Sequence, residues 1–331
     1  MCEQVLSRMS APSRVVRQAT ADFAAAQNVP LRSARRGQQM MTDTQAATPT
    51  LCRLQLGSEL RQIRMRAGLT STQVVRKLLW SPSKLTRLET GDNASVEPSD
   101  IMALCRVYGV DEETAEQLTE YATITKTKQE WWQSTVFRPI INPGAKAILG
   151  LESSASAVHT YQSDYVPGLL QTEEYVRVIH QHAKDDRPDE EIDRIVELRM
   201  TRQKALRRES PLKYATVISE AVLHRLVGGT SVMRAQLARI IEAASASNVK
   251  VQVVPFKVGV HRGMNGSFTT FQFRDRAALK PIVHLEHLAD HWVMRREPDV
   301  EMYEDVFNEL QAVSPGPQES LELIERVMKG L

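Results

Sequence analysis

The sequence has 331 residues, of which 42% are hydrophobic and 25% are charged, and its formal net charge is +2. This length and hydrophobic content predict two domains with packed cores, and the small net charge excludes a chain that is polycationic throughout. No apolar run approaches the length that crosses a bilayer. The three cysteines (Cys2, Cys52 and Cys105) show no metal-ligand spacing, so we expect no disulfide framework and a cytoplasmic location.

Residues 1–50 differ from the rest of the chain. They contain many arginine, alanine, glutamine, serine and threonine residues and little hydrophobic periodicity. We predict a disordered basic arm. The alternative is an over-extended start, with the natural one at Met40 or Met41.

The run from Ser81 to Gly91 predicts a short helix with a defined beginning and end. Ser81 can cap the first free N–H groups, and Pro82 suits the first helical position, where a missing N–H costs nothing. Gly91 supplies the left-handed residue that closes the helix. Hydroxyl side chains near the N-terminus, followed a turn later by Arg87, suit a DNA major groove.

Four further helices are predicted around this one within residues 51–127. The preceding helix, Ser71 to Leu79, forms a helix-turn-helix unit with it because a tight turn joins the two. The other three are indicated by Leu56, Leu60 and Ile63 at helical spacing, by the segment from Pro98 to Gly109, and by the segment from Asp111 toward Thr127. We therefore predict an all-α DNA-binding domain over residues 51–127.

The charge of this domain is uneven. Between Arg53 and Gly91 eight basic residues stand against Glu59 and Glu89, which gives +6 and can attract phosphates. We predict that Arg87 reads a guanine and that the other contacts to bases or phosphates come from Ser71, Thr72, Gln73, Ser81, Ser83, Lys84 and Thr86. The alternative is a helix-turn-helix that serves only to dock a protein.

Several motifs, taken in order, resemble one family. These are "RMRAGLTSTQVVRKLLWSPSKLTRLETG", "WW", "YVPGLLQTEEY", "VELRMTRQKAL" and "NVKVQVVPF". Together they resemble the actinobacterial XRE-type regulators, which join a lambda-repressor-like helix-turn-helix domain to an uncharacterised C-terminal domain, as in the WhiJ-like and antitoxin-like regulators of streptomycetes. The resemblance covers about residues 50–328. It implies a double-stranded DNA operator, a homodimer and a small partner protein encoded in a neighbouring gene.

Three positions depart from the usual pattern of this family. Val75 stands where alanine is usual, Ser71 where glutamine is common, and Leu79 where the turn normally has glycine. Leu79 must either adopt a positive φ, at a cost of about 1–2 kcal/mol, or let the turn open.

Residues 128–331 are predicted to form an α+β domain with a small sheet. The strand candidates are "YATVIS", "VKVQVVPF", "GSFTTFQF" and "PIVHLEH", because β-branched and aromatic residues dominate them or alternate with polar ones. Helices are expected near residues 145–157, 169–183, 189–208, 220–226, 232–246, 300–312 and 318–329.

Seven residues of this second domain are candidates for binding a partner. The pair Trp131 and Trp132 is expected to pack the two domains together rather than to stack on a ligand. An arginine cluster on one helix is the expected position for an acidic partner. The full set is Trp131, Trp132, Tyr161, Tyr175, Arg199, Arg202 and Arg207.

No catalytic constellation is visible. The chain has no glycine-rich phosphate loop, nucleophile elbow or zinc-protease helix. His284, His287 and His291 would share one face of a helix and could hold a metal, but the preceding "PIV" favours a strand, which sends the first two to opposite faces. We predict no enzyme activity, no cofactor and no metal site.

The sequence therefore predicts a sequence-specific transcriptional regulator with a C-terminal domain that receives a signal or partner. The alternative is an antitoxin-like protein that neutralises a small partner and regulates its own operon. A third possibility, an enzyme fused to a DNA anchor, would need a constellation that the sequence lacks.

Overall fold

The computed structural model describes residues 48–331, except for residues 94, 128, 142, 184–186, 275–278 and 287–290. The predicted disordered arm lies outside the described residues apart from its last three positions. There the first described helix begins at Pro49, two residues before the predicted domain boundary, because Thr48 caps it by accepting a hydrogen bond from the Leu51 N–H.

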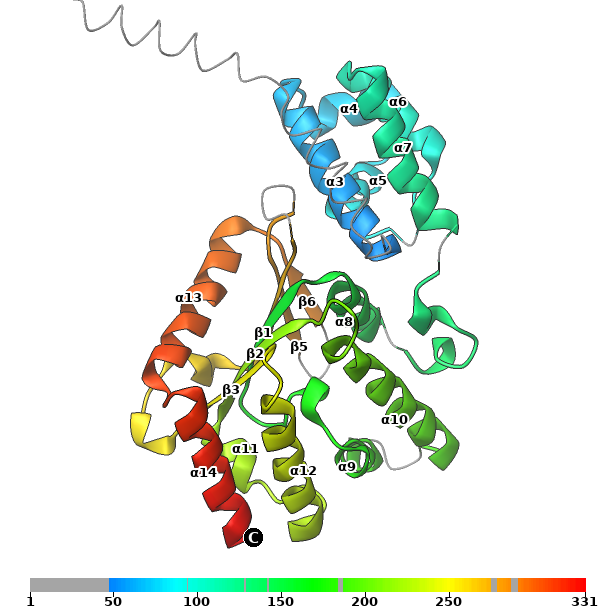
Figure 1. Cartoon of the computed structure of the whole chain (residues 1–331). Coiled ribbons are helices and arrows are strands. Elements are labelled where there is room, and N and C mark those ends of the chain that lie inside the picture. The colour runs from blue at the N-terminus through cyan, green and yellow to red at the C-terminus, as the bar shows by residue number, and fades with distance from the viewer. Residues whose placement is uncertain are drawn as a thin grey trace, which may run out of the picture. The chain divides into compact units, whose positions relative to one another are not determined.

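The N-terminal domain is all-α, as predicted. Gly57 allows its first helix to pack closely on the third, since a Cβ at Gly57 would lie 2.6 Å from the backbone oxygen of Leu88. A hydrophobic core that includes Leu56, Leu60 and Leu104 lies between the helices. The helices described in this domain are α3 (Pro49–Arg66), α4 (Ser71–Leu78), α5 (Pro82–Thr90), α6 (Pro98–Tyr108) and α7 (Glu112–Thr127) (Figure 1).

The C-terminal domain contains a mixed sheet with the strand order β3-β2-β1-β4-β5-β6. β1, β2 and β3 run parallel, whereas β4, β5 and β6 each pair antiparallel with the preceding strand in that order. The four predicted strands are confirmed, and β1 and β6 add to them. The bounds are β1 (Ala157–Gln162), β2 (Lys213–Ser219), β3 (Val249–Val254), β4 (Phe268–Gln272), β5 (Ile282–Glu286) and β6 (His291–Met294).

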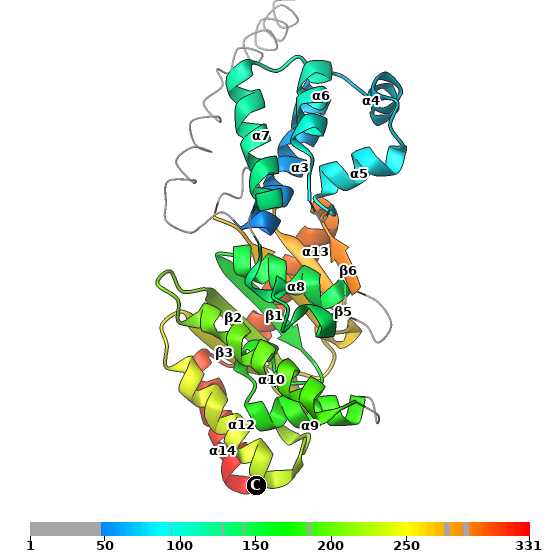
Figure 2. The same ribbon diagram turned by 90° about the vertical axis from the view of Figure 1, so that its right-hand side faces the viewer.

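Helices cover both faces of this sheet, with α13 on one face and α8, α9 and α10 on the other (Figures 1 and 2). α12 and α14 pack together beside β3. Their bounds are α8 (Pro143–Ser154), α9 (Glu173–Ala183), α10 (Asp189–Gln203), α11 (Glu220–His224), α12 (Gly229–Ala244), α13 (Glu297–Val313) and α14 (Pro317–Gly330). The fold is thus α+β, as predicted.

The two faces of the sheet differ in chemistry. Under α13 the strands bury apolar side chains such as Val217 and Val283, which join Phe307 of the helix in one core. On the opposite face, Thr160 pairs with Thr269, and His284 stands opposite Thr269 on the next strand. Because neighbours in register share a face, polar side chains line the centre of the sheet beneath α8 and α10.

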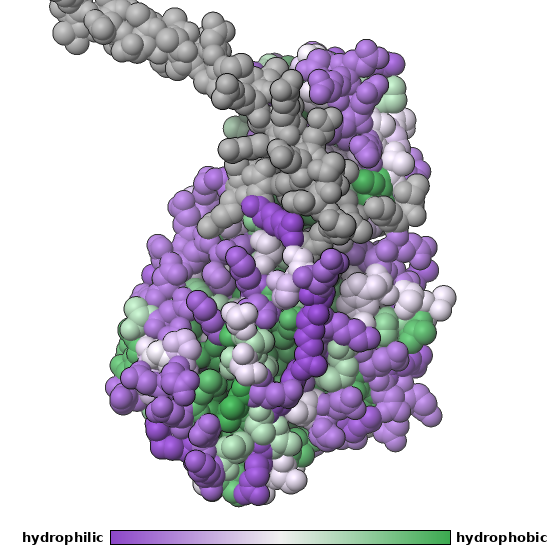
Figure 3. Space-filling view, in the orientation of Figure 1, coloured by the Kyte–Doolittle hydropathy of each residue, from purple (hydrophilic) through white to green (hydrophobic). Residues whose placement is uncertain are grey.

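The visible surface is mostly hydrophilic, with smaller hydrophobic areas among the polar ones (Figure 3). Within the described part of the chain, no helix combines the length and the apolar character needed to cross a membrane. Cys105 is buried in the N-terminal core, and burial raises the pKa of its thiol to about 11.

Candidate nucleic-acid interface

The pair α4 and α5 forms a helix-turn-helix with a defined cap at each helix start. Thr70 and Gln73 form a capping box on α4: the Gln73 N–H donates to Thr70 Oγ1 (3.2 Å) and the Thr70 N–H donates to Gln73 Oε1 (2.8 Å). Ser81 caps α5 by accepting from the Lys84 N–H at 3.3 Å, and Gly91 ends it with φ 71°. The predicted boundaries of α5 are confirmed.

Of the two alternatives at the turn, Leu79 adopts the strained positive φ rather than letting the turn open. Its φ is 56° and its ψ is 38°, and among the described residues it is the one non-glycine with a positive φ. This conformation keeps the turn closed, because the following Trp80 N–H still donates to the Val75 carbonyl at 2.9 Å. The Leu79 side chain is 93% exposed, so packing does not offset the strain.

The two helices separate apolar from polar residues. Val74 and Val75 of α4 and Leu85 and Leu88 of α5 are buried in the domain core, so the valine at the alanine position is accommodated. Seven of the eight predicted DNA-contacting residues are exposed: Ser71, Thr72, Gln73, Ser81, Ser83, Thr86 and Arg87.

Arg87 is the side chain on α5 best suited to contact DNA. It has no ion-pair partner among the described residues, so its guanidinium is available for an external acceptor. Near it, the Thr86 hydroxyl donates to the Pro82 carbonyl at 3.0 Å, and the Ser81 and Ser83 hydroxyls lie 3.1 Å apart. The helix therefore presents small hydroxyl groups, which hydrogen-bond within the helix itself, beside the unpaired guanidinium of Arg87.

Lys84 and Gln73 have internal partners that sequence reasoning missed. Lys84 Nζ is 2.7 Å from Asp100 Oδ1 on α6 and lies 4.0 Å from the centroid of the Trp80 ring. A phosphate contact by Lys84 would compete with both interactions. Gln73 already accepts from the cap of α4, which leaves its amide nitrogen for an outside acceptor.

A second internal pair also reduces the charge that the sequence suggested. Arg64 makes a bidentate contact with Glu89, with Nε–Oε1 at 2.6 Å and Nη2–Oε2 at 2.9 Å, and Nη1 donates to the Leu69 carbonyl at 2.9 Å. The hydrogen bond to Glu89 raises the pKa of Arg64. This pair ties the C-terminal ends of α3 and α5 together.

Arg53, Arg64 and Lys84 are thus three of the eight basic residues counted above that have internal partners. The other five are exposed and have no ion pair within the part of the chain that the structure describes. They are Arg61, Arg66, Arg76, Lys77 and Arg87. These five, rather than the full set, form the positive charge available to phosphates.

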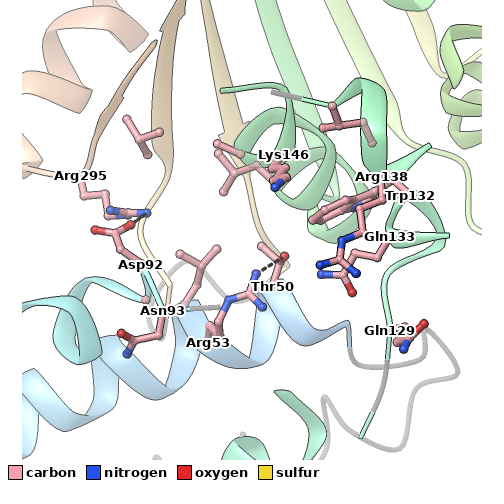
Figure 4. A pocket seen from close by; sticks show the side chains of 16 residues that line it. Thr50, Arg53, Asp92, Asn93, Gln129, Trp132, Gln133, Arg138, Lys146 and Arg295 are labelled. Carbon is pink, nitrogen blue, oxygen red and sulfur yellow. Dashed lines mark hydrogen bonds and ion pairs between the residues drawn. The ribbon is translucent and has the colours of Figure 1, made fainter. Parts of the chain in front are cut away.

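A cavity of about 590 Å³ adjoins the end of α5. Arg295 Nη2, in the segment after β6, donates to Asp92 Oδ1 just after α5 at 2.9 Å. Arg53 Nη2 donates to Thr50 Oγ1 at 2.7 Å. The close view shows both pairs, with Trp132 on another wall (Figure 4). Asp92 and Arg295 are 203 positions apart, so sequence reasoning could not find this link between the helix-turn-helix and the C-terminal domain.

The structure separates the predicted partner-binding residues. Trp132 is buried with Phe137, Ile141 and Leu149. It therefore packs the segment between α7 and α8 onto α8 rather than joining the two domains. Trp131 is 38% exposed and makes an edge contact with Phe137.

The remaining five candidates lie in different environments. Tyr161 and Tyr175 are buried inside the C-terminal domain, so neither offers a surface to a protein partner. Arg199 and Arg202 line a cavity beside the sheet. Arg207 is exposed, with Nη2 3.6 Å from Glu242 Oε1.

The histidines weighed as a metal site are only partly described. His287 lies outside the described residues. His284 is on β5, which confirms the expected strand, and its ring centroid is 5.5 Å from that of His291 on β6.

These features define a DNA-binding regulator of the helix-turn-helix class, and residues 55–118 match a family described as "Helix-turn-helix domain". Residues 145–326, more than half of the chain, match the family described as "Domain of unknown function (DUF5753)". The chain belongs to this family. No curated protein and no solved structure is a significant match to it.

Proposed function

We propose that this chain is a sequence-specific transcriptional regulator that binds operator DNA as a homodimer and whose C-terminal domain receives a signal. In this proposal α5 enters the major groove, Arg87 reads a guanine, and Ser83 and Thr86 contact base edges or methyl groups. Dimerisation would place two copies of α5 on half-sites about one helical turn apart. We further propose that the C-terminal domain binds its signal and does not catalyse a reaction on it.

The observation that carries the DNA-binding part is the free, exposed Arg87 on a rigidly held α5. The helix is fixed at its start by Ser81 and at its end by the Arg64–Glu89 pair. A guanidinium on a fixed backbone can make the bidentate contact to guanine O6 and N7 that distinguishes this base in the major groove.

The signal-receiving part is supported by contacts between α3 and the C-terminal domain. Thr48 Oγ1 and Ser154 Oγ on α8 lie 2.7 Å apart, and the Thr50 N–H donates to the buried Glu130 carboxylate at 2.9 Å. A Cβ at Gly150 of α8 would lie 2.5 Å from Thr50 Oγ1, so the two helices are in close contact. A shift of α8 would therefore displace the start of α3 in the DNA-binding domain.

The test starts from DNA sites selected from a random library by the full-length protein. Arg87→Ala and the control Lys77→Ala are then titrated on a selected site and a scrambled site at about 50 and 200 mM salt. We expect Arg87→Ala to cost about 1–3 kcal/mol on the selected site alone and to relax the preference at one base pair. Lys77→Ala should weaken both DNAs slightly and reduce the salt dependence.

Two results would contradict this proposal. Equal weakening of both sites by Arg87→Ala would make Arg87 a phosphate contact and the assigned register of α5 wrong. A footprint over a single half-site would remove the dimer from the proposal.

A further inference from the structure

A partly open cavity of about 630 Å³ lies in the C-terminal domain between the polar face of the sheet and helices α8, α9 and α10. Its floor includes Thr160, Thr269 and His284 from three adjacent strands. Its walls combine charged groups from α10 with apolar side chains such as Ile148 and Leu169. This mixture of apolar walls and a few convergent polar groups is typical of a small-molecule site.

Two arginines one turn apart on α10 face this cavity, and only one of them has a carboxylate bonded to it. Arg202 makes a bidentate contact with the buried Glu152 of α8, with Nε–Oε1 at 2.7 Å and Nη2–Oε2 at 2.8 Å. Arg199 makes no hydrogen bond or ion pair within the part of the chain that the structure describes. Its Nη1 lies directly against Gly168, so a Cβ there would force the guanidinium to move.

The electrostatic environment of Arg199 disfavours its charged form, and no carboxylate of the described residues is bonded to it. Burial, followed by the neighbouring charge of Arg202, lowers the pKa of Arg199 to about 10, although Glu286 at the cavity attracts it from a distance. Burial is also the main cause that lowers the pKa values of His180 and His284 to about 4. Both imidazoles are thus neutral at pH 7.

Several polar atoms of the same cavity are buried without a hydrogen-bond partner among the described residues. These atoms are Gln171 Oε1, His180 Nε2 and His284 Nε2. A buried polar group left without a partner costs free energy, and such groups are rare in folded proteins. Their presence around one cavity, together with the unpaired guanidinium, indicates that the cavity is built for a polar occupant.

We propose that this cavity binds a small organic molecule with a single carboxylate, which the Arg199 guanidinium holds in a bidentate contact. The polar face of the sheet then contacts the hydroxyl or carbonyl groups of that molecule, and its apolar part packs on the walls. That this molecule is also the signal for DNA binding rests on the proposed function above.

The charges around the cavity favour a monoanion over a phosphate ester. Glu152 is bonded to Arg202, and the cavity-lining Arg225 is 3.3 Å from Asp164, so each of these pairs is neutral. A dianion would meet one free guanidinium and also the Glu286 carboxylate, which would repel its second charge. A carboxylate matches the single Arg199 fork in charge and geometry.

The experiment measures binding of 4-hydroxybenzoate to the full-length protein by calorimetry, with 4-hydroxybenzamide and inorganic phosphate as comparison probes. The variants are Arg199→Gln, Arg199→Lys and the control Arg207→Gln, which removes an exposed arginine outside the cavity. We expect the benzoate to bind and the benzamide and phosphate to bind far more weakly. Arg199→Gln should weaken benzoate binding about 10- to 100-fold, Arg199→Lys should restore part of it, and Arg207→Gln should not change it.

Thermal unfolding of the same variants separates a binding role from a structural one. Removal of an unpaired, partly desolvated cation should leave the melting temperature of Arg199→Gln at or above that of the wild type. A clear fall in melting temperature would make Arg199 a structural residue and overturn the proposal. Binding of the benzamide or phosphate as tight as that of the benzoate, or no binding of the benzoate, would also overturn it.

DNA titration with and without the benzoate then tests separately whether the bound molecule changes the affinity for DNA. If ligand binding depends on Arg199 but leaves the DNA affinity unchanged, the cavity is a binding site but the bound molecule is not the signal for DNA binding. A failure of DNA binding both with and without the benzoate would count against the proposed function and not against the cavity.

Discussion

Replacement of Leu79 by glycine should stabilise the DNA-binding domain. Leu79 is held at φ 56° in the turn between α4 and α5, where a Cβ approaches the backbone too closely. Glycine has no Cβ and adopts this conformation without strain. The leucine side chain is 93% exposed, so its removal forfeits almost no buried apolar area.

The magnitude follows from opposing terms. Relief of the left-handed strain is worth about 1–2 kcal/mol. Glycine loses more chain entropy on folding, which costs about 0.5–1 kcal/mol. Loss of the small buried fraction of the side chain costs about 0.2 kcal/mol or less. With the middle of each range, the expected net stabilisation is about 0.5–1 kcal/mol.

Hydrogen exchange is the suitable assay because it reports on this domain within the full-length chain. The informative amide is that of Trp80, which donates to the Val75 carbonyl at the end of α4. A gain of about 0.5–1 kcal/mol should slow its exchange about two- to fivefold. Leu79→Ala is the matched control, since alanine retains the Cβ and should change the stability by less than about 0.5 kcal/mol.

Two outcomes would refute the reasoning. Faster exchange in Leu79→Gly, with no change in Leu79→Ala, would mean that the turn is not strained in solution. Faster exchange in both variants to the same extent would mean that the leucine side chain packs against a surface.

Three further changes test the fold around the two sites. Glu89→Gln removes the carboxylate that Arg64 contacts between α3 and α5, where the two side chains are 12% and 8% exposed, so the domain should lose about 1–3 kcal/mol in urea unfolding, more than a surface charge pair would give. Gly57→Ala should destabilise the domain by about 1–3 kcal/mol in the same assay, because the new Cβ meets the α5 backbone; unchanged stability would mean that α5 is not packed this closely. His284→Asn should reduce the dependence of stability on pH. Burial depresses the pKa of His284 from 6.5 to about 4 in the folded state, so its contribution is complete above pH 6.5, falls as the pH drops toward 4, and then levels off. At pH 5 the wild type should have lost about 2 kcal/mol more than the variant relative to pH 7, and parallel curves would contradict the assignment.

The helices of the DNA-binding domain could be predicted because their signals are local. Ser81, Pro82 and Gly91 mark the ends of α5 within a few residues of the backbone groups they satisfy. The partners of its charged residues are not local. Lys84 pairs with Asp100, and Arg64 with Glu89 25 positions away, so the sequence overstated the free positive charge.

The strand β1 escaped prediction for a related reason. Its segment "AVHTYQ" buries Thr160 on the same face as Val158, and a buried threonine does not follow the usual alternation of apolar and polar residues. The edge strand β6 is only four residues long, which is too short for a periodicity signal. Both strands border the cavity whose polar lining obscures their pattern.

The arginine cluster that the sequence singled out divides at the end of α10. Arg199 and Arg202 are three positions apart and therefore share the inward face of the helix. Arg207 lies beyond the helix end at Gln203 and points to solvent. The sequence could indicate that these arginines meet an acidic group, but only the position of Glu152 on α8 shows that one guanidinium is already neutralised while the other is not.

The helix α8 connects the two arginines with the DNA-binding domain. Glu152 holds Arg202 on the cavity side, while Gly150 and Ser154 of the same helix contact Thr50 and Thr48 at the start of the DNA-binding domain. In the proposal, a carboxylate bound at Arg199 competes electrostatically with Glu152 for the neighbouring guanidinium, because both anions face the same pair of cations. In the same proposal, a movement of Glu152 is passed to α8, whose residues also contact α3. The helix α8 therefore contacts both the cavity and the first helix of the DNA-binding domain, and it is the element through which the proposed signal would pass.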